Sequence, residues 1–279
     1  MARRRRSRID ACGLWGVELC VLSAVLFATL GVIDSCMLIL WIVSLTIGDV
    51  SIVDIFWGPG FAILAWTSHF VGDGEGARTW LVCALVTVWA GRLAAHLARR
   101  NLGRGEDYRY RSMRARHGAR FPIVSLGSVF LLQAALLWVV SWPLLAVHVP
   151  GASAGLGWLD AAGVLLWSAG LAVEATADAQ LAGFTRAPDS KGRVMDRGLW
   201  RYSRHPNYFG DCLLWWGFGV FGLAAGRPWS LIGPVVMTVL LVRVSGVALL
   251  ESTITERRPG YRAYIQRTSA FVPWPPREP

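Results

Sequence analysis

The chain has 279 residues, of which 54% are hydrophobic, and its mean hydropathy is +0.44. This composition excludes an ordinary soluble globular protein, because a soluble domain of this size does not need so much apolar surface. Lysine and arginine number 28 against 18 aspartates and glutamates, a net charge of +10, and only Lys191 is a lysine. Such an arginine excess suits cytoplasmic membrane loops, or the binding of phosphate oxygens by planar guanidinium groups.

Apolar stretches recur along the whole chain, and an α-helix of roughly 20 residues is needed to cross the roughly 30 Å hydrocarbon core of a bilayer. The runs are continuous and do not alternate, which favours helices over the strands of a barrel. We therefore predict an all-α polytopic membrane protein, a bundle of seven transmembrane helices forming a single domain over residues 1–279. In chain order the predicted spans are 16–47, 52–70, 78–98, 122–148, 157–183, 207–225 and 228–254.

Charge is distributed unevenly over the segments between these spans. The connections 99–121 and 184–206, together with the C-terminal tail, hold 19 Lys and Arg residues, whereas connections 71–77 and 149–156 hold none. With seven spans the basic segments share one side, which the positive-inside rule makes cytoplasmic. We expect a multi-pass protein of a bacterial inner membrane. The arginines within residues 3–8 then lie on the opposite side, so either an eighth span exists or the larger bias outweighs them.

The densest polar motif is Gly198-Leu-Trp-Arg-Tyr-Ser-Arg-His-Pro-Asn-Tyr-Phe-Gly-Asp211. Pro206 suits the first turn of a helix, where its missing N–H has no partner to lose. Asn207, Asp211 and Trp215 recur every four residues and so share one helix face. Polar groups at the mouth of a membrane helix require partners or a ligand. The alternative is a capped helix end with interfacial aromatic side chains.

Two acids one helical turn apart, Glu174 and Asp178, lie on the fifth predicted span. They repel each other unless cations neutralise them, and Lys191 and Arg193 in the following connection are candidates. A ligand site and a structural ion-pair cluster at the membrane interface both explain this arrangement.

Two further charges lie inside predicted spans. Arg92 requires an acidic partner or a ligand phosphate, and Asn101 and Arg104 would then close over that ligand. Asp54, with Trp57 beside it, lies early in the second span, where desolvation raises the pKa of a carboxyl group. Such an acid donates a hydrogen bond or a proton. Alternatively, Asp54 is a helix-start acid at the polar boundary.

Together these residues resemble the membrane-bound steroid 5α-reductase (3-oxo-5α-steroid 4-dehydrogenase) family, and its bacterial members most closely. The similarity rests on Gly198 to Asp211, on Trp215-Trp-Gly and on the tail Gly260-Tyr-Arg-Ala-Tyr with Phe271-Val-Pro, and it extends back to Ser51-Ile-Val-Asp54. It implies seven spans and NADPH-dependent reduction of the Δ4 C=C bond of a 3-oxo steroid or similar apolar enone. The hydride would reach the β-carbon while an acid polarises the carbonyl.

The resemblance also implies site residues. Asp54 falls where the family has a carboxylate that hydrogen-bonds the substrate ketone, and Trp57 lies beside it. In the family a tyrosine is the partner of this carboxylate. This chain departs from that pattern, because the position closest to the tyrosine is Trp89, whose indole N–H cannot titrate. Glu174 replaces an asparagine of the family. The cofactor-binding residues that we expect are Arg92, Asn101, Arg104, Glu174, Asp178, Lys191, Arg193, Tyr202, His205, Asn207, Tyr208, Asp211 and Trp215.

No GxGxxG segment follows a strand, so NADPH would be held by helix ends and loops on the cytoplasmic side. The five cysteines form no CxxC pair, so we expect packing residues and no metal site. The expected partners are membrane lipids and an apolar enone or steroid entering from lipid. We expect a monomer that binds no nucleic acid.

Two alternatives remain. Isoprenylcysteine carboxyl methyltransferases are similar in their Arg-His-Pro-x-Tyr-x-Gly turn and their C-terminal tail, and they bind S-adenosylmethionine. A non-enzymatic lipid-binding protein would use its arginines on anionic headgroups. The polar residues upstream, Asp54, Arg92, Asn101 and Arg104, favour the reductase.

Overall fold

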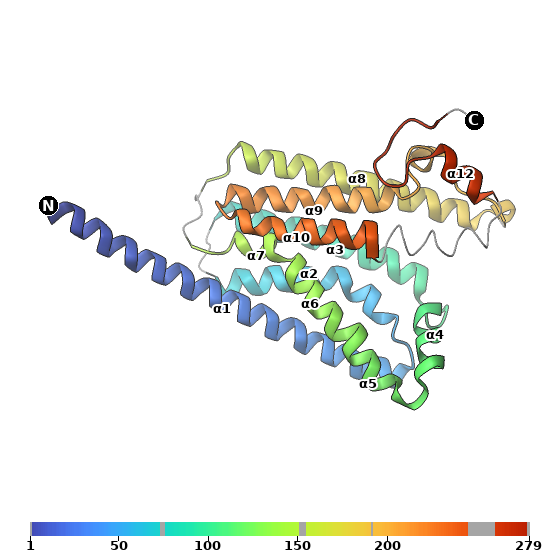
Figure 1. Cartoon of the computed structure of the whole chain (residues 1–279), viewed down its shortest axis with the longest axis horizontal. Helices are drawn as coiled ribbons and strands as arrows, with labels where there is room; N and C mark the ends of the chain where they lie inside the picture. The colour runs from blue at the N-terminus through green and yellow to red at the C-terminus, as the bar shows by residue number, and fades with distance from the viewer. Residues whose placement is uncertain (1, 73–75, 151–154, 191, 245–259, 278–279) are drawn as a thin grey trace. The chain divides into compact units, whose positions relative to one another are not determined.

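The computed structural model describes residues 2–72, 76–150, 155–190, 192–244 and 260–277, with side chains from residue 16 onward (Figure 1). These residues are helical or irregular, and the β-structure among them is one isolated bridge between Ser203 and Ser269. The all-α prediction is therefore confirmed for the described part of the chain. The chain forms two compact units, Met1–Leu156 with Phe221–Ser230, and Gly157–Val220 with Leu231–Pro279.

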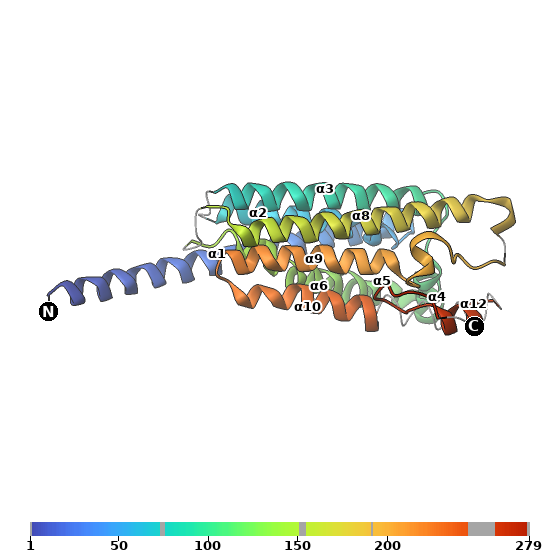
Figure 2. The same cartoon turned by 90° about the horizontal axis from the view of Figure 1, so that it is seen from above.

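The first unit is built on helices α1 (Ala2–Ile47), α2 (Ile52–Val71) and α3 (Ala77–Asn101). Helix α2 packs against both α1 and α3, as Figures 1 and 2 show. Gly58 of α2 permits the close approach of α3, because a Cβ there would lie 2.9 Å from the carbonyl oxygen of Ala90. Apolar side chains of α2 and α3 fill this interface and hold both helices in register.

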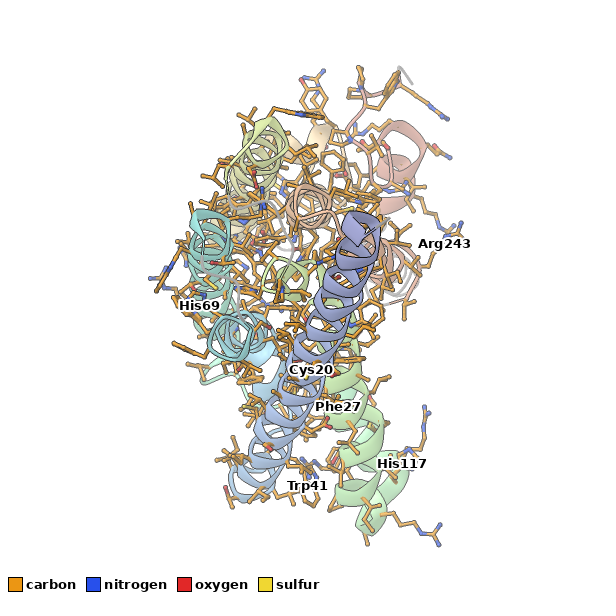
Figure 3. All side chains as sticks on the ribbon, turned by 90° about the vertical axis from the view of Figure 1, so that its left-hand side faces the viewer. Cys20, Phe27, Trp41, His69, His117 and Arg243 are labelled. Carbon is orange, nitrogen blue, oxygen red and sulfur yellow. The ribbon has the colours of Figure 1, made fainter. Side chains whose placement is uncertain are left out.

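A run of short helices completes the first unit. They are α4 (Tyr108–His117), η1 (Gly118–Arg120), α5 (Phe121–Ser125), η2 (Leu126–Leu131), α6 (Leu132–Val140) and α7 (Trp142–Ala146). The basic connection expected over 99–121 is thus largely helical, because Asp107 caps α4 by accepting the N–H of Arg109 at 2.9 Å. Trp41 of α1, labelled in Figure 3, donates to the carbonyl of Pro122 at 3.0 Å.

The second unit contains α8 (Trp158–Arg186), η3 (Pro188–Ser190), η4 (Gly198–Arg201), most of α9 (Pro206–Ala224), α10 (Ile232–Val239), η6 (Leu240–Val244) and α12 (Tyr261–Arg267). The end of α9 and most of η5 (Pro228–Leu231) belong to the first unit. Helices α8 and α9 run side by side (Figures 1 and 2). Glycines allow this contact, since a Cβ on Gly170 would lie 2.5 Å from the oxygen of Gly210. Such small-residue packing is common between membrane helices.

By length and composition, four helices of the described chain can cross a membrane: Gly16–Ile47, Ala77–Asn101, Tyr108–Val140 and Trp158–Arg186. This supports the membrane prediction but does not confirm seven spans. Helices α2 and α9 have 20 and 19 residues and are not among these four. Pro228–Val244 is a shorter apolar helix. Residues 245–254 of the predicted seventh span lie outside the described residues.

Candidate functional site

The polar centre of the first unit is Asp54, in the first turn of α2. Its Oδ1 accepts a hydrogen bond from the Tyr110 hydroxyl at 2.8 Å, and its Oδ2 accepts one from the Arg109 guanidinium at 2.8 Å. The Asp54 side chain is 18% exposed and Tyr110 is 6% exposed. Both oxygens of a largely buried carboxyl group are therefore held by consecutive residues of α4.

The start of α4 is locked to the turn before α2. Ser51 Oγ accepts the N–H of Asp107 at 2.6 Å, and Asp107 Oδ1 accepts from the backbone N–H of Arg109 at 2.9 Å and from its Nε at 3.0 Å. Burial alone would raise the pKa of Asp107, but these bonds and the charge of Arg109 outweigh it and hold that pKa below its usual value. Arg109 is thereby oriented toward Asp54.

Glu106 makes a second lock beside the first. It accepts the N–H of Val50 at 3.1 Å and two hydrogen bonds from Arg114, from Nε at 3.0 Å and from the terminal nitrogen at 2.8 Å. Burial by itself raises the pKa of Glu106, yet the two-pronged contact with Arg114 and the Val50 N–H lower it overall. The two locks fix where α4 presents Tyr110.

Sequence analysis missed Tyr110. The resemblance places Trp89 nearest the family's tyrosine, whereas in the structure the phenol on Asp54 comes from α4. Trp57 and Trp89 both contact Phe61, with ring centroids 5.5 and 5.8 Å apart, and Trp89 is fully buried. Tyr110 lies in residues 99–121, which the sequence analysis assigned to a connection between spans. A capped helix in that segment buries one of its faces, and this was the only sequence signal that could have pointed to Tyr110.

Three expected nucleotide contacts lie at the end of α3. Arg92 is half-buried within the helix, Asn101 ends it, and Arg104 follows in an exposed turn. Asn101 Oδ1 accepts from the Nε of Arg100 at 3.1 Å, and the N–H of Arg104 donates to the Asn101 carbonyl at 3.2 Å. The turn therefore holds Asn101 and Arg104 close together.

In the second unit the polar start of α9 meets the two acids of α8. Glu174 and Asp178 are 4% and 6% exposed, and Asn207 Nδ2 donates to Asp178 Oδ1 at 3.2 Å. The close approach depends on Gly210, where a Cβ would lie 2.5 Å from the backbone nitrogen of Glu174. The expected acidic pair and the expected Asn207 are thus parts of one cluster.

The other expected cofactor residues lie around this cluster or apart from it. His205 stacks on Tyr208, with ring planes 3° apart and centroids at 5.6 Å. Trp215 is fully buried, and its ring packs against Phe218. Asp211 lies one turn before Trp215. Tyr202 is 43% exposed, Arg193 is exposed and pairs with Asp189, and Lys191 lies outside the described residues.

The turn before α9 is covered by the C-terminal tail. The Tyr264 hydroxyl donates to the carbonyls of Trp200 and Ser203, and Ser203 Oγ donates to the carbonyl of Phe271 at 2.7 Å. Burial of Tyr264, which is 1% exposed, fastens α12 onto this turn.

A pocket of about 330 Å³ opens beside the tail. Three of its lining residues are arginines that the sequence analysis did not select: Arg204, Arg267 and Arg277. Arg204 is 8% exposed and donates to the carbonyl of Ile265 at 2.9 Å. A pocket lined by guanidinium groups suits an anionic group such as a phosphate.

The described residues form an all-helical membrane protein, with a polar centre at Asp54 in the first unit and another at Asp178 in the second. Residues 40–268 match the family described as "Protein of unknown function (DUF1295)", so the chain belongs to that family. It is also similar to the Schizosaccharomyces pombe protein described as "Uncharacterized protein C594.04c". That relative is 27% identical over 264 residues, which cover 84% of this chain and 76% of the relative. No solved structure matches the chain.

Proposed function

We propose that this protein is an NADPH-dependent reductase that adds a hydride and a proton across the C=C bond of an apolar enone, with a 3-oxo-Δ4 steroid as the model substrate. The observation that carries the proposal is the hydrogen-bonded pair of Asp54 and Tyr110. A carboxyl group and a phenol that are hydrogen-bonded and largely shielded from water can polarise a substrate carbonyl by donating a hydrogen bond to its oxygen.

The ability of the pair to donate a hydrogen bond to the substrate depends on how many protons Asp54 and Tyr110 carry together. With a single proton between the two oxygens, the Tyr110 O–H is directed at Asp54 and no hydrogen is left for the substrate. With Asp54 also protonated, one O–H closes the pair and the other is free to donate to the substrate carbonyl. The doubly protonated pair is therefore the form that stabilises charge on the carbonyl oxygen as the β-carbon is reduced.

Arg109 orients this pair. Its guanidinium holds Oδ2 of Asp54 at 2.8 Å, which leaves Oδ1 directed at Tyr110. The guanidinium charge also stabilises negative charge that develops nearby. The locks at Asp107 and Glu106 keep α4 in place, so the pair is preorganised before substrate binds.

The cofactor assignment is supported by the anionic character of NADPH and by the donors that the chain presents. NADPH supplies a hydride when bound, and it carries a pyrophosphate and a 2′-phosphate. Arg204, Arg267 and Arg277 line a pocket that fits phosphate oxygens. The buried Asn207–Asp178 cluster offers both amide and carboxylate groups for the neutral polar parts of a nucleotide.

The experiment separates binding from turnover. Purified full-length protein in detergent is titrated with NADPH, NADH and S-adenosylmethionine, and then supplied with NADPH and progesterone. We expect NADPH to bind most tightly and the Δ4 bond to be reduced. Tight binding of S-adenosylmethionine without NADPH binding would replace the proposal with a methyltransferase. Binding of none of the three nucleotides would leave the lipid-binding alternative.

Asp54→Asn tests the role of the pair within this function. The amide keeps the size of the side chain but has no acidic proton to share with Tyr110, so we expect unchanged NADPH affinity and loss of turnover. Asp34→Asn on α1 is the matched control, because it makes the same chemical change outside the polar centre. Turnover that survives in Asp54→Asn would remove Asp54 from the mechanism.

A further inference from the structure

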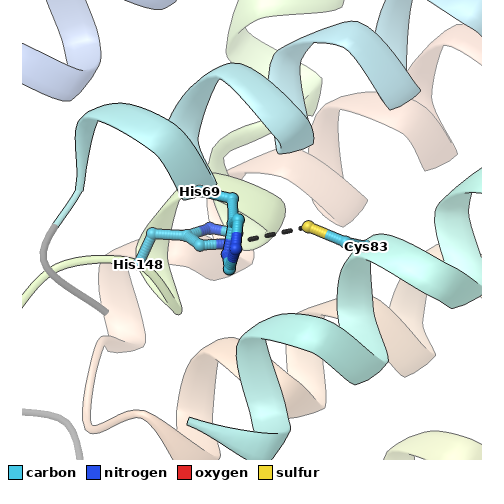
Figure 4. A group of neighbouring side chains, drawn as sticks. All are labelled: His69, Cys83 and His148. Carbon is cyan, nitrogen blue, oxygen red and sulfur yellow. Dashed lines mark hydrogen bonds between the residues drawn. The ribbon is translucent and has the colours of Figure 1, made fainter. Parts of the chain in front are cut away.

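Three potential metal ligands converge in the first unit, at the opposite end of α2 from Asp54. His69 lies on the last turns of α2, Cys83 on α3, and His148 in the turn after α7 (Figure 4). One donor atom from each lies within 4.8 Å of the other two. Fifteen residues of α2 separate Asp54 from His69, about 22 Å along the helix, so this cluster is distinct from the proposed reductase centre.

The spacing of the donor atoms matches metal coordination. Cys83 Sγ lies 3.6 Å from His148 Nε2. Around a tetrahedral Zn²⁺, metal–sulfur and metal–nitrogen distances of about 2.3 and about 2.05 Å place sulfur and nitrogen about 3.5 Å apart. The distance between Cys83 Sγ and His148 Nε2 is already close to this value. A displacement of about 1 Å, within reach of a side-chain rotation, would bring the His69 ring to the corresponding distance.

The hydrogen bonds orient His148 as a ligand. Its Nδ1 lies 2.9 Å from the carbonyl oxygen of Leu144. A carbonyl only accepts, so Nδ1 carries the hydrogen and Nε2 presents its lone pair toward Cys83. This is the arrangement found in metal-binding histidines, whose second ring nitrogen donates to a backbone carbonyl. His148 is fully buried, so its ring is held in this orientation.

His69 has one ring nitrogen, Nδ1, that is available to bind a metal ion. Its Nδ1 is shielded from solvent and has no hydrogen-bond partner among the described residues. A buried polar atom without a partner is uncommon and calls for an explanation such as an ion. Trp66, Phe70 and Trp80 surround the ring, with Trp80 closest at 4.4 Å between centroids.

We propose that His69, Cys83 and His148 bind one thiophilic transition-metal ion, Zn²⁺ or Cu⁺. A thiolate with two imidazoles suits both ions. On binding, the Cys83 thiol gives its proton to solvent and its sulfur forms the bond to the metal. Cu⁺ would be satisfied by the three ligands as a site of zero net charge, whereas Zn²⁺ would take a fourth ligand such as water.

The test uses full-length protein that carries no polyhistidine tag, is stripped with a chelator under reducing conditions, and is titrated with Co²⁺ as a spectroscopic probe. We expect one Co²⁺ per chain and a thiolate-to-cobalt charge-transfer band that Zn²⁺ abolishes by displacement. A parallel titration with Cu⁺ against a chromogenic chelator shows which of the two ions is held more tightly.

Variants assign the ligands. Cys83→Ser should lose the charge-transfer band, and His148→Gln should weaken Co²⁺ binding at least tenfold. Cys36→Ser on α1 is the matched control and should keep both the band and the stoichiometry. Wild-type protein that takes up no stoichiometric Co²⁺, Zn²⁺ or Cu⁺ would overturn the proposal without any variant. Unchanged binding in both Cys83→Ser and His148→Gln would overturn it as well.

Discussion

Tyr110→Phe removes a single oxygen atom from the centre of the proposed reductase site. The lost hydroxyl lies 2.8 Å from Asp54 Oδ1 and belongs to a residue that is 6% exposed, so water replaces it poorly. Losing one preorganised donor to a developing oxyanion costs about 10²–10³-fold in kcat. Leaving Oδ1 of Asp54 without its partner should also lower the free energy of unfolding by about 1–3 kcal/mol, because a buried acceptor is left unsatisfied.

The assay is steady-state NADPH oxidation with progesterone, combined with direct titration of NADPH binding and thermal unfolding in detergent. We expect kcat to fall while the dissociation constant for NADPH stays within twofold. Tyr108→Phe makes the same change two residues earlier, on a side chain that is 39% exposed, and should leave kcat unchanged. Equal losses in both variants, or full activity in Tyr110→Phe, would refute a role for Tyr110 in the pair with Asp54.

Three further substitutions test the supports of the two polar centres. Glu106→Gln should lower the free energy of unfolding by about 1–3 kcal/mol at neutral pH. The pKa of Glu106 is lower in the folded state than in the unfolded state, where it is near 4.5. The stabilisation by the Glu106 carboxylate is therefore present above pH 4.5 and is lost as the pH falls through the folded-state pKa. Asn207→Ala should weaken NADPH binding at least tenfold, measured by titration, because the amide that bonds Asp178 is lost. Gly210→Ala should lower the unfolding temperature, because its Cβ would lie 2.5 Å from backbone of α8, whereas Gly91→Ala meets nothing within 4 Å and should not.

Each of these predictions has a contrary outcome. A Glu106→Gln deficit that is equally large at pH 3 and pH 7 would mean that its charge is not the source of stability. NADPH affinity that is unchanged in Asn207→Ala would remove the α8–α9 cluster from the cofactor site. A Gly210→Ala variant as stable as Gly91→Ala would show that α8 and α9 can separate without loss.

The helical class of the protein was predictable because the hydrogen bonds of a helix are local. In an apolar medium the backbone must satisfy itself within each segment, so a continuous apolar run determines a helix wherever it packs. The predicted spans 157–183 and 207–225 agree with α8 and α9 to within three residues. The spacing of Glu174 and Asp178 likewise placed both acids on one face of α8, where both are buried.

Tertiary structure alone decided which side chains meet between helices. Tyr110 reaches Asp54 across 56 positions of sequence, and Cys83 reaches His148 across 65. No spacing rule covers such pairs, because they depend on how helices pack and not on the period of any one helix. The predicted connection 99–121 contains helix α4, and Arg109 and Tyr110 at the start of that helix hydrogen-bond Asp54. The sequence by itself determined that the chain is helical and apolar enough for a membrane, and helix packing determined its polar centres.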